Sequence, residues 1–119
     1  MITISKEFVF DAAHKLPGAI YGKCNNLHGH TYKLIVTISG GISNDGWLMN
    51  FTELKNLVKK LILDKYDHAY LNDFYDIPTA EIMAKDFFDV LFPHVGKYSC
   101  TLYAIRLYET PTSYCEVTG

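Results

Sequence analysis

Residues 28–39 read His-Gly-His-Thr-Tyr-Lys-Leu-Ile-Val-Thr-Ile-Ser, and every second residue from Tyr32 to Ile38 is large and apolar. Alternation at period two is typical of a β-strand with one buried face. Glycines at 40–41 and an Asn-Asp-Gly run at 44–46 end the pattern. The sequence therefore predicts a strand over about 28–39 that begins with two histidines on one side.

Three further segments have the composition of strands. Residues 99–108 are rich in Tyr, Leu and Ile, and residues 113–118 form a short run after Pro111. Residues 2–10 alternate, and their apolar positions on one face are Ile2, Ile4, Phe8 and Phe10.

Two helices are expected between the second and third strands. Asn50 can cap the first helix, and Glu53 three residues later matches a capping box. The second helix starts at Pro78-Thr79, and we expect Pro93 to end it. A loop over 67–76 would join the two helices. Apolar residues of the first helix repeat at helical spacing, at Phe51, Leu54, Leu57, Val58, Leu61 and Ile62.

The predicted order of elements is ββααββ, in a single domain that spans residues 1–119. We expect an α+β fold, with an antiparallel sheet and both helices on one of its faces. A four-stranded sheet has two edges whose main-chain groups lack partners. Pairing these edges with neighbouring subunits would satisfy them, so we expect an oligomer closed into a barrel.

Composition and charge exclude several classes of protein. The chain has 119 residues and a net charge of −2, so it provides no basic surface for nucleic acid or an anionic membrane. No apolar run approaches the ~20 residues that cross a bilayer. The start, Met1-Ile2-Thr3-Ile4, lacks the regions of a signal peptide. The odd set of 3 cysteines indicates free thiols. We therefore expect a cytoplasmic protein.

Three histidines form a candidate metal site. His28 and His30 point to the same side of one strand, and Gly29 leaves the position between them uncrowded. His14 follows the first strand, and antiparallel pairing would bring it to the same end. Three neutral imidazoles with an open fourth position are a ligand set of catalytic zinc, which can polarise a carbonyl or hydroxyl group. The same histidines could instead be unrelated polar residues beside a turn.

A second group of residues could transfer protons or bind substrate. Cys24 precedes His28 by four residues, and a thiol near a bound cation has a lowered pKa and can act as a base. Asp67 could orient the adjacent His68. Glu109 could bind an amidine-like edge through two parallel hydrogen bonds. Simple packing of the thiol, a turn role for Asp67 and solvation of Glu109 are alternatives that the residues leave open.

Six stretches of sequence, in this order, resemble the 6-pyruvoyl-tetrahydropterin synthase and 6-carboxy-tetrahydropterin synthase family. They extend over nearly the whole chain, and six motifs in the family's order argue against coincidence. The stretches are 10–17 (Phe-Asp-Ala-Ala-His-Lys-Leu-Pro), 24–32 (Cys-Asn-Asn-Leu-His-Gly-His-Thr-Tyr), 50–55 (Asn-Phe-Thr-Glu-Leu-Lys), 67–73 (Asp-His-Ala-Tyr-Leu-Asn-Asp), 78–81 (Pro-Thr-Ala-Glu) and 109–110 (Glu-Thr).

The resemblance implies the tunnelling fold, in which ββααββ subunits assemble through their sheets into barrels, typically as hexamers. It also implies zinc bound by His14, His28 and His30. The substrate implied is a pterin triphosphate, bound in a pocket between subunits.

The resemblance further implies roles in catalysis. It assigns Cys24 as the base that abstracts a proton, and Asp67 with His68 as a second acid–base pair. It makes Glu109 the anchor for the guanidine-like edge of the pterin. It also makes Thr79 and Ala80 contacts to the pterin in the pocket between subunits.

The family divides by reaction. One branch eliminates triphosphate from 7,8-dihydroneopterin triphosphate and leaves 6-pyruvoyl-tetrahydropterin. The other also cleaves the side chain, releases acetaldehyde and supplies 7-deazaguanine (queuosine) synthesis. The interval Cys-x-x-x-His-Gly-His at 24–30 resembles the second branch, because the first typically has two more residues there. We therefore predict a zinc-dependent lyase that forms 6-carboxy-5,6,7,8-tetrahydropterin; the alternatives are the pyruvoyl branch and a non-catalytic zinc- or pterin-binding subunit.

Overall fold

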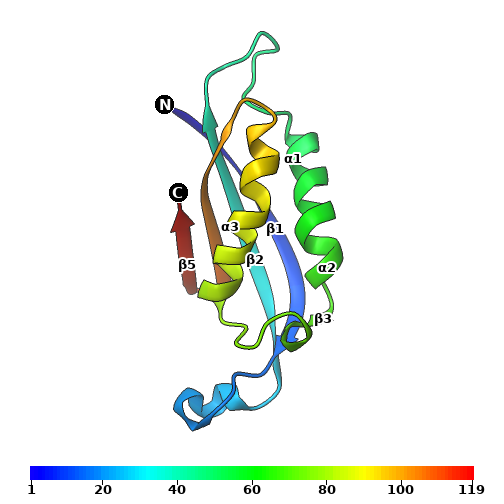
Figure 1. Cartoon of the computed structure of the whole chain (residues 1–119), viewed down its shortest axis with the longest axis vertical. Helices are drawn as coiled ribbons and strands as arrows, with labels where there is room; N and C mark the ends of the chain where they lie inside the picture. Colours follow the sequence, from blue (N-terminus) through cyan, green and yellow to red (C-terminus); the bar gives the residue numbers. More distant parts are fainter.

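The computed structural model describes residues 1–119 except for the side chain of Cys24. In these residues a sheet of five strands has the spatial order β3-β1-β2-β4-β5, with helices packed on it (Figure 1). The expected α+β fold is confirmed. The strands are β1 (Ile2–His14), β2 (His28–Gly40), β3 (Ala69–Tyr70), β4 (Thr101–Thr110) and β5 (Ser113–Thr118).

Antiparallel pairing dominates the sheet, as expected. β1 and β2 pair along their whole length, from Ile2 opposite Gly40 to His14 opposite His28. β2 pairs with β4, and β4 pairs with β5, in the same antiparallel sense. Each of these pairs places inward-facing residues of one strand beside those of the next.

The segment 67–76, expected to be a loop, contains two short elements. β3 pairs in parallel with β1, where Ala69 lies opposite Ala12, and a 3-10 turn, η3 (Leu71–Asp73), follows it. The sheet is therefore mixed, with a fifth strand at the β1 edge. A strand of two residues is too short to give a periodic signal in the sequence.

Polar caps begin both main helices. The side chain of Asn50 accepts a hydrogen bond from the main chain of Thr52 at 2.9 Å. The hydroxyl of Thr79 accepts from the main chain of Ile82 at 3.2 Å. The first helix runs without a break through α1 (Phe51–Val58), a π-helical turn η2 (Lys59–Leu63) and α2 (Asp64–Tyr66). The second helix is α3 (Ala80–Gly96). A 3-10 segment, η1 (Ala19–Asn25), lies between β1 and β2.

The prediction that Pro93 ends the second helix is wrong. Pro93 lies inside α3, which continues to Gly96. Proline inside a helix costs about 3 kcal/mol, because it lacks an N–H group and its ring crowds the preceding turn. Leu91 and Val95 on either side of it are fully buried, so packing of the last turn against the sheet offsets this cost.

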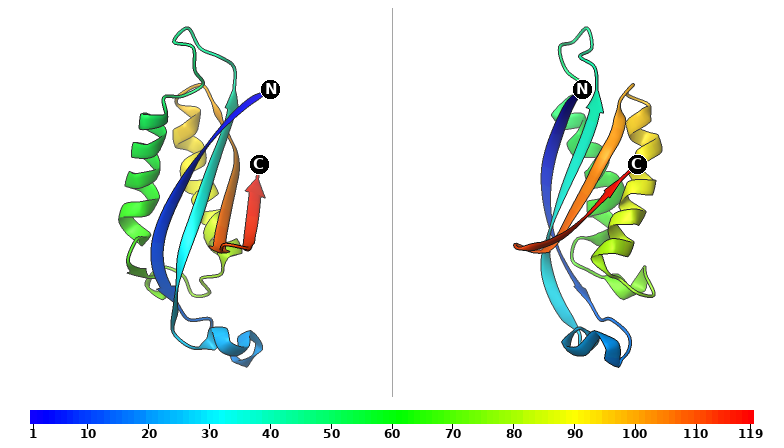
Figure 2. Two further views of the ribbon diagram at one scale, coloured as in Figure 1. Left: turned by 180° about the vertical axis from the view of Figure 1, so that it is seen from behind. Right: turned by 90° about the vertical axis from the view of Figure 1, so that its left-hand side faces the viewer.

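Both helices cover the same face of the sheet, as expected (Figures 1 and 2). The residues of β1, β2 and β4 that face the helices form the core, and burial of each large apolar side chain contributes roughly 1.5–3 kcal/mol. No helix covers the opposite face in the described part of the chain. The main strand residues of the core are Phe8, Phe10, Tyr32, Leu34, Val36, Ile38, Leu102, Ile105 and Leu107.

Replacing the proline inside α3 should stabilise the protein. We expect Pro93→Ala to raise the free energy of unfolding by about 1–3 kcal/mol, because alanine restores the N–H group and relieves the crowded turn. Urea unfolding followed by circular dichroism measures the change. Pro111→Ala, in the turn between β4 and β5, is the control and should lower stability by up to about 1 kcal/mol. A Pro93→Ala variant less stable than the wild type would contradict this account of α3.

Candidate metal and acid–base site

The candidate metal site is the polar end of the buried face of the sheet. Alternate residues of each strand point to that face, and they are apolar along most of its length. At one end the inward row of β1 finishes with His14, that of β2 with His30 and His28, and that of β4 with Glu109. β1 extends to His14, beyond the predicted strand, and the antiparallel register puts His14 directly opposite His28, at the end where it was expected.

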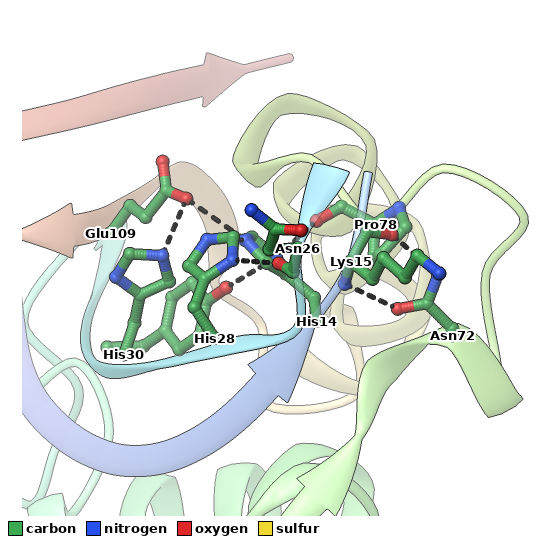
Figure 3. Close-up of polar contacts among 9 residues, drawn as sticks. His14, Lys15, Asn26, His28, His30, Asn72, Pro78 and Glu109 are labelled. Carbon is green, nitrogen blue, oxygen red and sulfur yellow. Dashed lines mark hydrogen bonds and ion pairs between the residues drawn. The ribbon is translucent and has the colours of Figure 1, made fainter. Parts of the chain in front are cut away.

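Ligand-type atoms of these four side chains converge on one point (Figure 3). Nε2 of His14 lies 3.0 Å from Nε2 of His28. Oε1 of Glu109 lies 3.4 Å from Nε2 of His14 and 3.1 Å from Nε2 of His30. All four side chains offer atoms within 4.8 Å of one another, so one ion could contact all of them. The sequence predicted the three histidines at this point but not Glu109.

Main-chain carbonyl groups fix the orientation of two of the imidazole rings. Nδ1 of His14 lies 3.0 Å from the carbonyl oxygen of Pro78, and Nδ1 of His28 lies 2.7 Å from that of Asn26. A carbonyl oxygen can only accept, so each Nδ1 carries the hydrogen and each Nε2 presents its lone pair to the centre. Metal-binding histidines are commonly held by such a hydrogen bond.

The histidines fit a metal ion in two further respects. Nε2 of His30 is buried and has no hydrogen-bond partner among the described residues, although Glu109 lies close to it. Such an atom costs about 1–3 kcal/mol, and a cation at the centre would satisfy it. Burial, reinforced by the neighbouring His28, lowers the pKa of His14 and His30, while the Glu109 carboxylate opposes the shift. Both rings therefore favour the neutral form, which is the form that binds zinc.

Asp67 and His68 form a contact of their own at the β1 edge of the sheet. Oδ1 of Asp67 lies 3.1 Å from Nδ1 of His68 and accepts a hydrogen bond from the main chain of Asp11 at 3.0 Å. His68 has a φ of 62°, which is unusual for a residue with a side chain, and its side chain is 79% exposed. Its main-chain N–H donates to the carbonyl oxygen of Asp11 at 2.6 Å. These bonds hold an exposed imidazole beside a carboxylate.

Within one chain, the cluster of three imidazoles and Glu109 and the Asp67–His68 pair face different sides of the sheet. The side chains of Asp11 and Thr31 point away from the imidazoles and are hydrogen-bonded to each other at 2.6 Å. His68 borders a cavity of about 410 Å³ on this outer side. His30 touches that cavity between Gly29 and Thr31, whereas its ring nitrogen belongs to the inner cluster.

Two of the three predicted substrate contacts share a cavity. Ala80 and Glu109 border a space of about 190 Å³ at the start of α3, whereas the hydroxyl of Thr79 caps that helix. Glu109 thus stands between this cavity and the imidazoles. The full lining is Ala80, Glu81, Glu109, Ser113, Tyr114 and Cys115.

The predicted base, Cys24, lies outside the described side chains. Its main chain belongs to η1, which extends beyond the end of the sheet next to β2 (Figure 1).

Sequence reasoning missed the groups that support the site from behind. The amide of Asn72 brackets the residue after His14: its Oδ1 accepts from the main-chain N–H of Lys15 at 2.9 Å, and its Nδ2 donates to the carbonyl oxygen of Lys15 at 2.7 Å (Figure 3). Asn72 lies four residues after His68 in the chain. Its contact with Lys15 therefore connects the segment that carries His68 with the end of β1 that carries His14. Main-chain carbonyl groups are present in every residue, so the residue types do not show which of them accept these hydrogen bonds. Only the motif at 67–73, which contains Asn72, could have indicated the contact with Lys15.

A family model described as 6-pyruvoyl tetrahydropterin synthase matches residues 3–119. The chain belongs to the 6-pyruvoyl tetrahydropterin synthase family. Members of this family are enzymes that synthesise pterins. Among the described residues, no helix combines the length and the apolarity needed to cross a membrane.

Curated relatives of this family member carry two names. The 6-carboxy-5,6,7,8-tetrahydropterin synthase of Haemophilus influenzae is 43% identical, over 98% of both chains. The enzyme of the same name from Bacillus subtilis is 36% identical, over 94% of this chain and 82% of its own. The 6-pyruvoyl tetrahydrobiopterin synthase of Dictyostelium discoideum is 33% identical, over 99% of this chain and 96% of its own.

Solved structures give the same fold. The structure of Caenorhabditis elegans 6-pyruvoyl tetrahydropterin synthase superimposes with a TM-score of 0.88 at 29% sequence identity, covering 99% of this chain and 95% of that chain. The predicted family and fold class are therefore confirmed.

The lowered pKa values predict how the metal-free protein responds to acid. Below the usual histidine pKa of about 6.5, the unfolded chain binds protons that folded His14 and His30 still exclude. The free energy of unfolding should therefore fall as the pH drops from about 7 to about 5, by up to about 1.4 kcal/mol per pH unit for each histidine.

Urea unfolding of chelator-treated protein over this pH range measures the slope. In the His30→Asn variant the slope should be smaller, because one of the two buried imidazoles is removed. Stability that rises on acidification would contradict the assignment of neutral, buried imidazoles.

Proposed function

We propose that this family member converts 7,8-dihydroneopterin triphosphate to 6-carboxy-5,6,7,8-tetrahydropterin, with release of acetaldehyde and triphosphate, in 7-deazaguanine (queuosine) biosynthesis. The observation that carries the proposal is the convergence of three imidazoles on one point at the end of the sheet. The relatives from H. influenzae and B. subtilis, named for the 6-carboxy product, support this branch. The short interval between Cys24 and His28 supports the same choice.

Formation of 6-pyruvoyl-tetrahydropterin is the second candidate function. The D. discoideum relative named for a 6-pyruvoyl product is 33% identical over 99% of the chain, which favours this alternative. Both reactions eliminate triphosphate, and they differ in whether the side chain is then cleaved. The same residues would serve either reaction, so the products must distinguish them.

His14, His28 and His30 would hold a zinc ion. When bound, zinc would supply a Lewis acid that makes the hydroxyl groups and the adjoining C–H of the substrate side chain more acidic. The rings are prepared for this task, because hydrogen bonds to Pro78 and Asn26 already direct two Nε2 lone pairs to the centre. The buried position of His14, which is 0% exposed, excludes water from one side of the site.

Glu109 would anchor the pterin. Its carboxylate can accept two parallel hydrogen bonds from the guanidine-like edge, and it borders the same cavity as Ala80. Thr79 would contribute at the edge of this cavity. Glu109 also borders, with His30, a cavity of about 420 Å³. The cavity next to Ala80 is about 190 Å³, which is small beside the roughly 300–1,000 Å³ of typical ligand pockets, so a neighbouring subunit would supply further walls there.

Proton transfer would involve two groups. Cys24 would act as the base that removes a proton from the substrate side chain. His68, oriented by Asp67 at 3.1 Å, would return or relay protons. Since His68 and the imidazole cluster of one chain open to different sides of the sheet, we propose that His68 serves a substrate held by a neighbouring subunit, in a hexamer closed through sheet edges.

Product analysis tests the proposed reaction. Zinc-loaded protein incubated anaerobically with 7,8-dihydroneopterin triphosphate should yield 6-carboxytetrahydropterin and acetaldehyde, detected by mass spectrometry and an aldehyde assay. Cys24→Ala should retain zinc and lose at least about 100-fold in turnover, because it removes the general base. Pyruvoyl product without acetaldehyde would move the protein to the second candidate. An intact, zinc-loaded protein without turnover would favour a binding subunit.

Mixing two inactive variants tests whether the site is shared. A hexamer assembled from equal amounts of His28→Ala and His68→Ala chains should recover about a quarter of wild-type activity, because about a quarter of the sites combine intact groups from two chains. A mixture of His28→Ala with His30→Ala is the control and should stay inactive, since both changes affect the same cluster. Absence of recovery in the first mixture, with mixed oligomers demonstrated, would refute a shared site.

A further inference from the structure

Glu109 lies closer to the imidazoles than an anchor for a pterin alone requires. Its Oε1 atom is 3.1 Å from Nε2 of His30 and 3.4 Å from Nε2 of His14. Nε2 of His28 completes the group, 3.0 Å from that of His14. Figure 3 shows the carboxylate of Glu109 turned toward the rings, from β4, the strand that pairs with β2.

The three measured separations are close to those between neighbouring ligand atoms around a tetrahedral metal ion. Zinc bonds of about 2.0–2.2 Å to nitrogen and oxygen place neighbouring ligand atoms roughly 3.3–3.6 Å apart. The observed separations of 3.0, 3.1 and 3.4 Å are close to this range. Three of the six separations among these four atoms are therefore close to the spacing of a four-ligand centre, and all six are within 4.8 Å.

The protonation of the rings also favours a cation at the centre. The hydrogens of His14 and His28 are on Nδ1, where they are donated to main-chain carbonyls, so both Nε2 atoms carry lone pairs. The carboxylate of Glu109 also offers only lone pairs. Acceptor atoms this close together repel one another, and a cation between them turns the repulsion into coordination.

We propose that Glu109 is the fourth protein ligand of the metal centre when no substrate is bound. Three imidazoles and one carboxylate then surround the ion, and no position on it is left to water. Glu109 is suited to this position because it continues the inward row of β4 beyond Leu107, next to the rows that carry the histidines.

The proposal has a consequence for substrate binding, which rests on the proposed function. One carboxylate cannot hold the ion and the guanidine-like edge of a pterin at the same time. Because Glu109 borders both the imidazole cluster and the cavity next to Ala80, arrival of the pterin would draw the carboxylate away from the ion. The substrate itself would thereby open the fourth position for its own side-chain oxygen.

Cobalt substitution tests the ligand set without any turnover. The zinc-free, full-length protein is loaded with Co²⁺, and its visible absorption is recorded between about pH 6 and about pH 9. Water bound to a metal in such a site loses a proton near about pH 7, which changes the spectrum. With Glu109 as a ligand, the wild-type spectrum should stay constant over this range.

Removing the carboxylate should admit water. Glu109→Ala should gain a spectral transition near about pH 7 and lose at least about tenfold in Co²⁺ affinity. Glu109→Gln keeps the size of the side chain and removes its charge, so it should also lose Co²⁺ affinity. Its agreement with Glu109→Ala would show that the loss does not come from a folding defect. Glu81→Gln is the matched control, because Glu81 lines the same cavity as Glu109 without belonging to the cluster; its spectrum should equal that of the wild type.

Three results would overturn the proposal. The wild-type spectrum could show the same pH transition as Glu109→Ala, which would place water on the ion. A sulfur-to-cobalt charge-transfer band in the near ultraviolet would place a cysteine in the fourth position. Failure of the wild-type protein to bind cobalt would remove the metal centre itself. A protein with the expected spectra but no turnover would instead count against the proposed reaction and leave the ligand set standing.

Discussion

The antiparallel register between β1 and β2 is the constraint on which the rest of the site depends. A shift by one residue would turn every inward side chain of β1 to the opposite face, and would bring Asp11 rather than His14 toward the helices. Phe10 and Tyr32, which stack as opposite partners within the core, make that shift costly, because Phe10 would lose its burial and Tyr32 would lose its stacking partner. The hydrophobic core therefore fixes the position of the imidazoles, and the polar end of the sheet requires no separate scaffold.

The helix layer contributes to the site through its first turn. Pro78 directly precedes the cap residue of α3, so packing of that helix on the sheet also holds the carbonyl group that orients His14. Asn72 acts from the other side, since its amide binds the main chain of Lys15. The ligand geometry is thus set by the buried faces of two layers, whereas Asp67 and His68 lie at an exposed edge. This difference suits a rigid ion site, with the proposed acid–base pair at an edge that a neighbouring chain could reach.

Much of the fold could be predicted from the sequence, because the apolar residues of β1, β2 and β4 repeat at period two and those of α1 at helical spacing. The approach of His14 to the end of the sheet that carries His28 and His30 follows from the same patterns. Three features could not be read in this way. Pro93 is a local signal for the end of a helix, and packing of the last turn overrides it. β3 has two residues, too few to show a periodic pattern. Glu109 reaches the imidazoles only through the register between β2 and β4. The carbonyl groups of Pro78 and Asn26 have no side-chain signature at all.

The central claim is that a metal ion lies where the three imidazoles converge. Anomalous diffraction from crystals of the zinc-loaded protein, recorded above and below the zinc absorption edge, tests it most directly. The account predicts one strong anomalous peak per chain, about 2.0–2.1 Å from Nε2 of His14, His28 and His30. A zinc-loaded crystal without a peak at this point, or with its peak beside Asp67 and His68 instead, would contradict it.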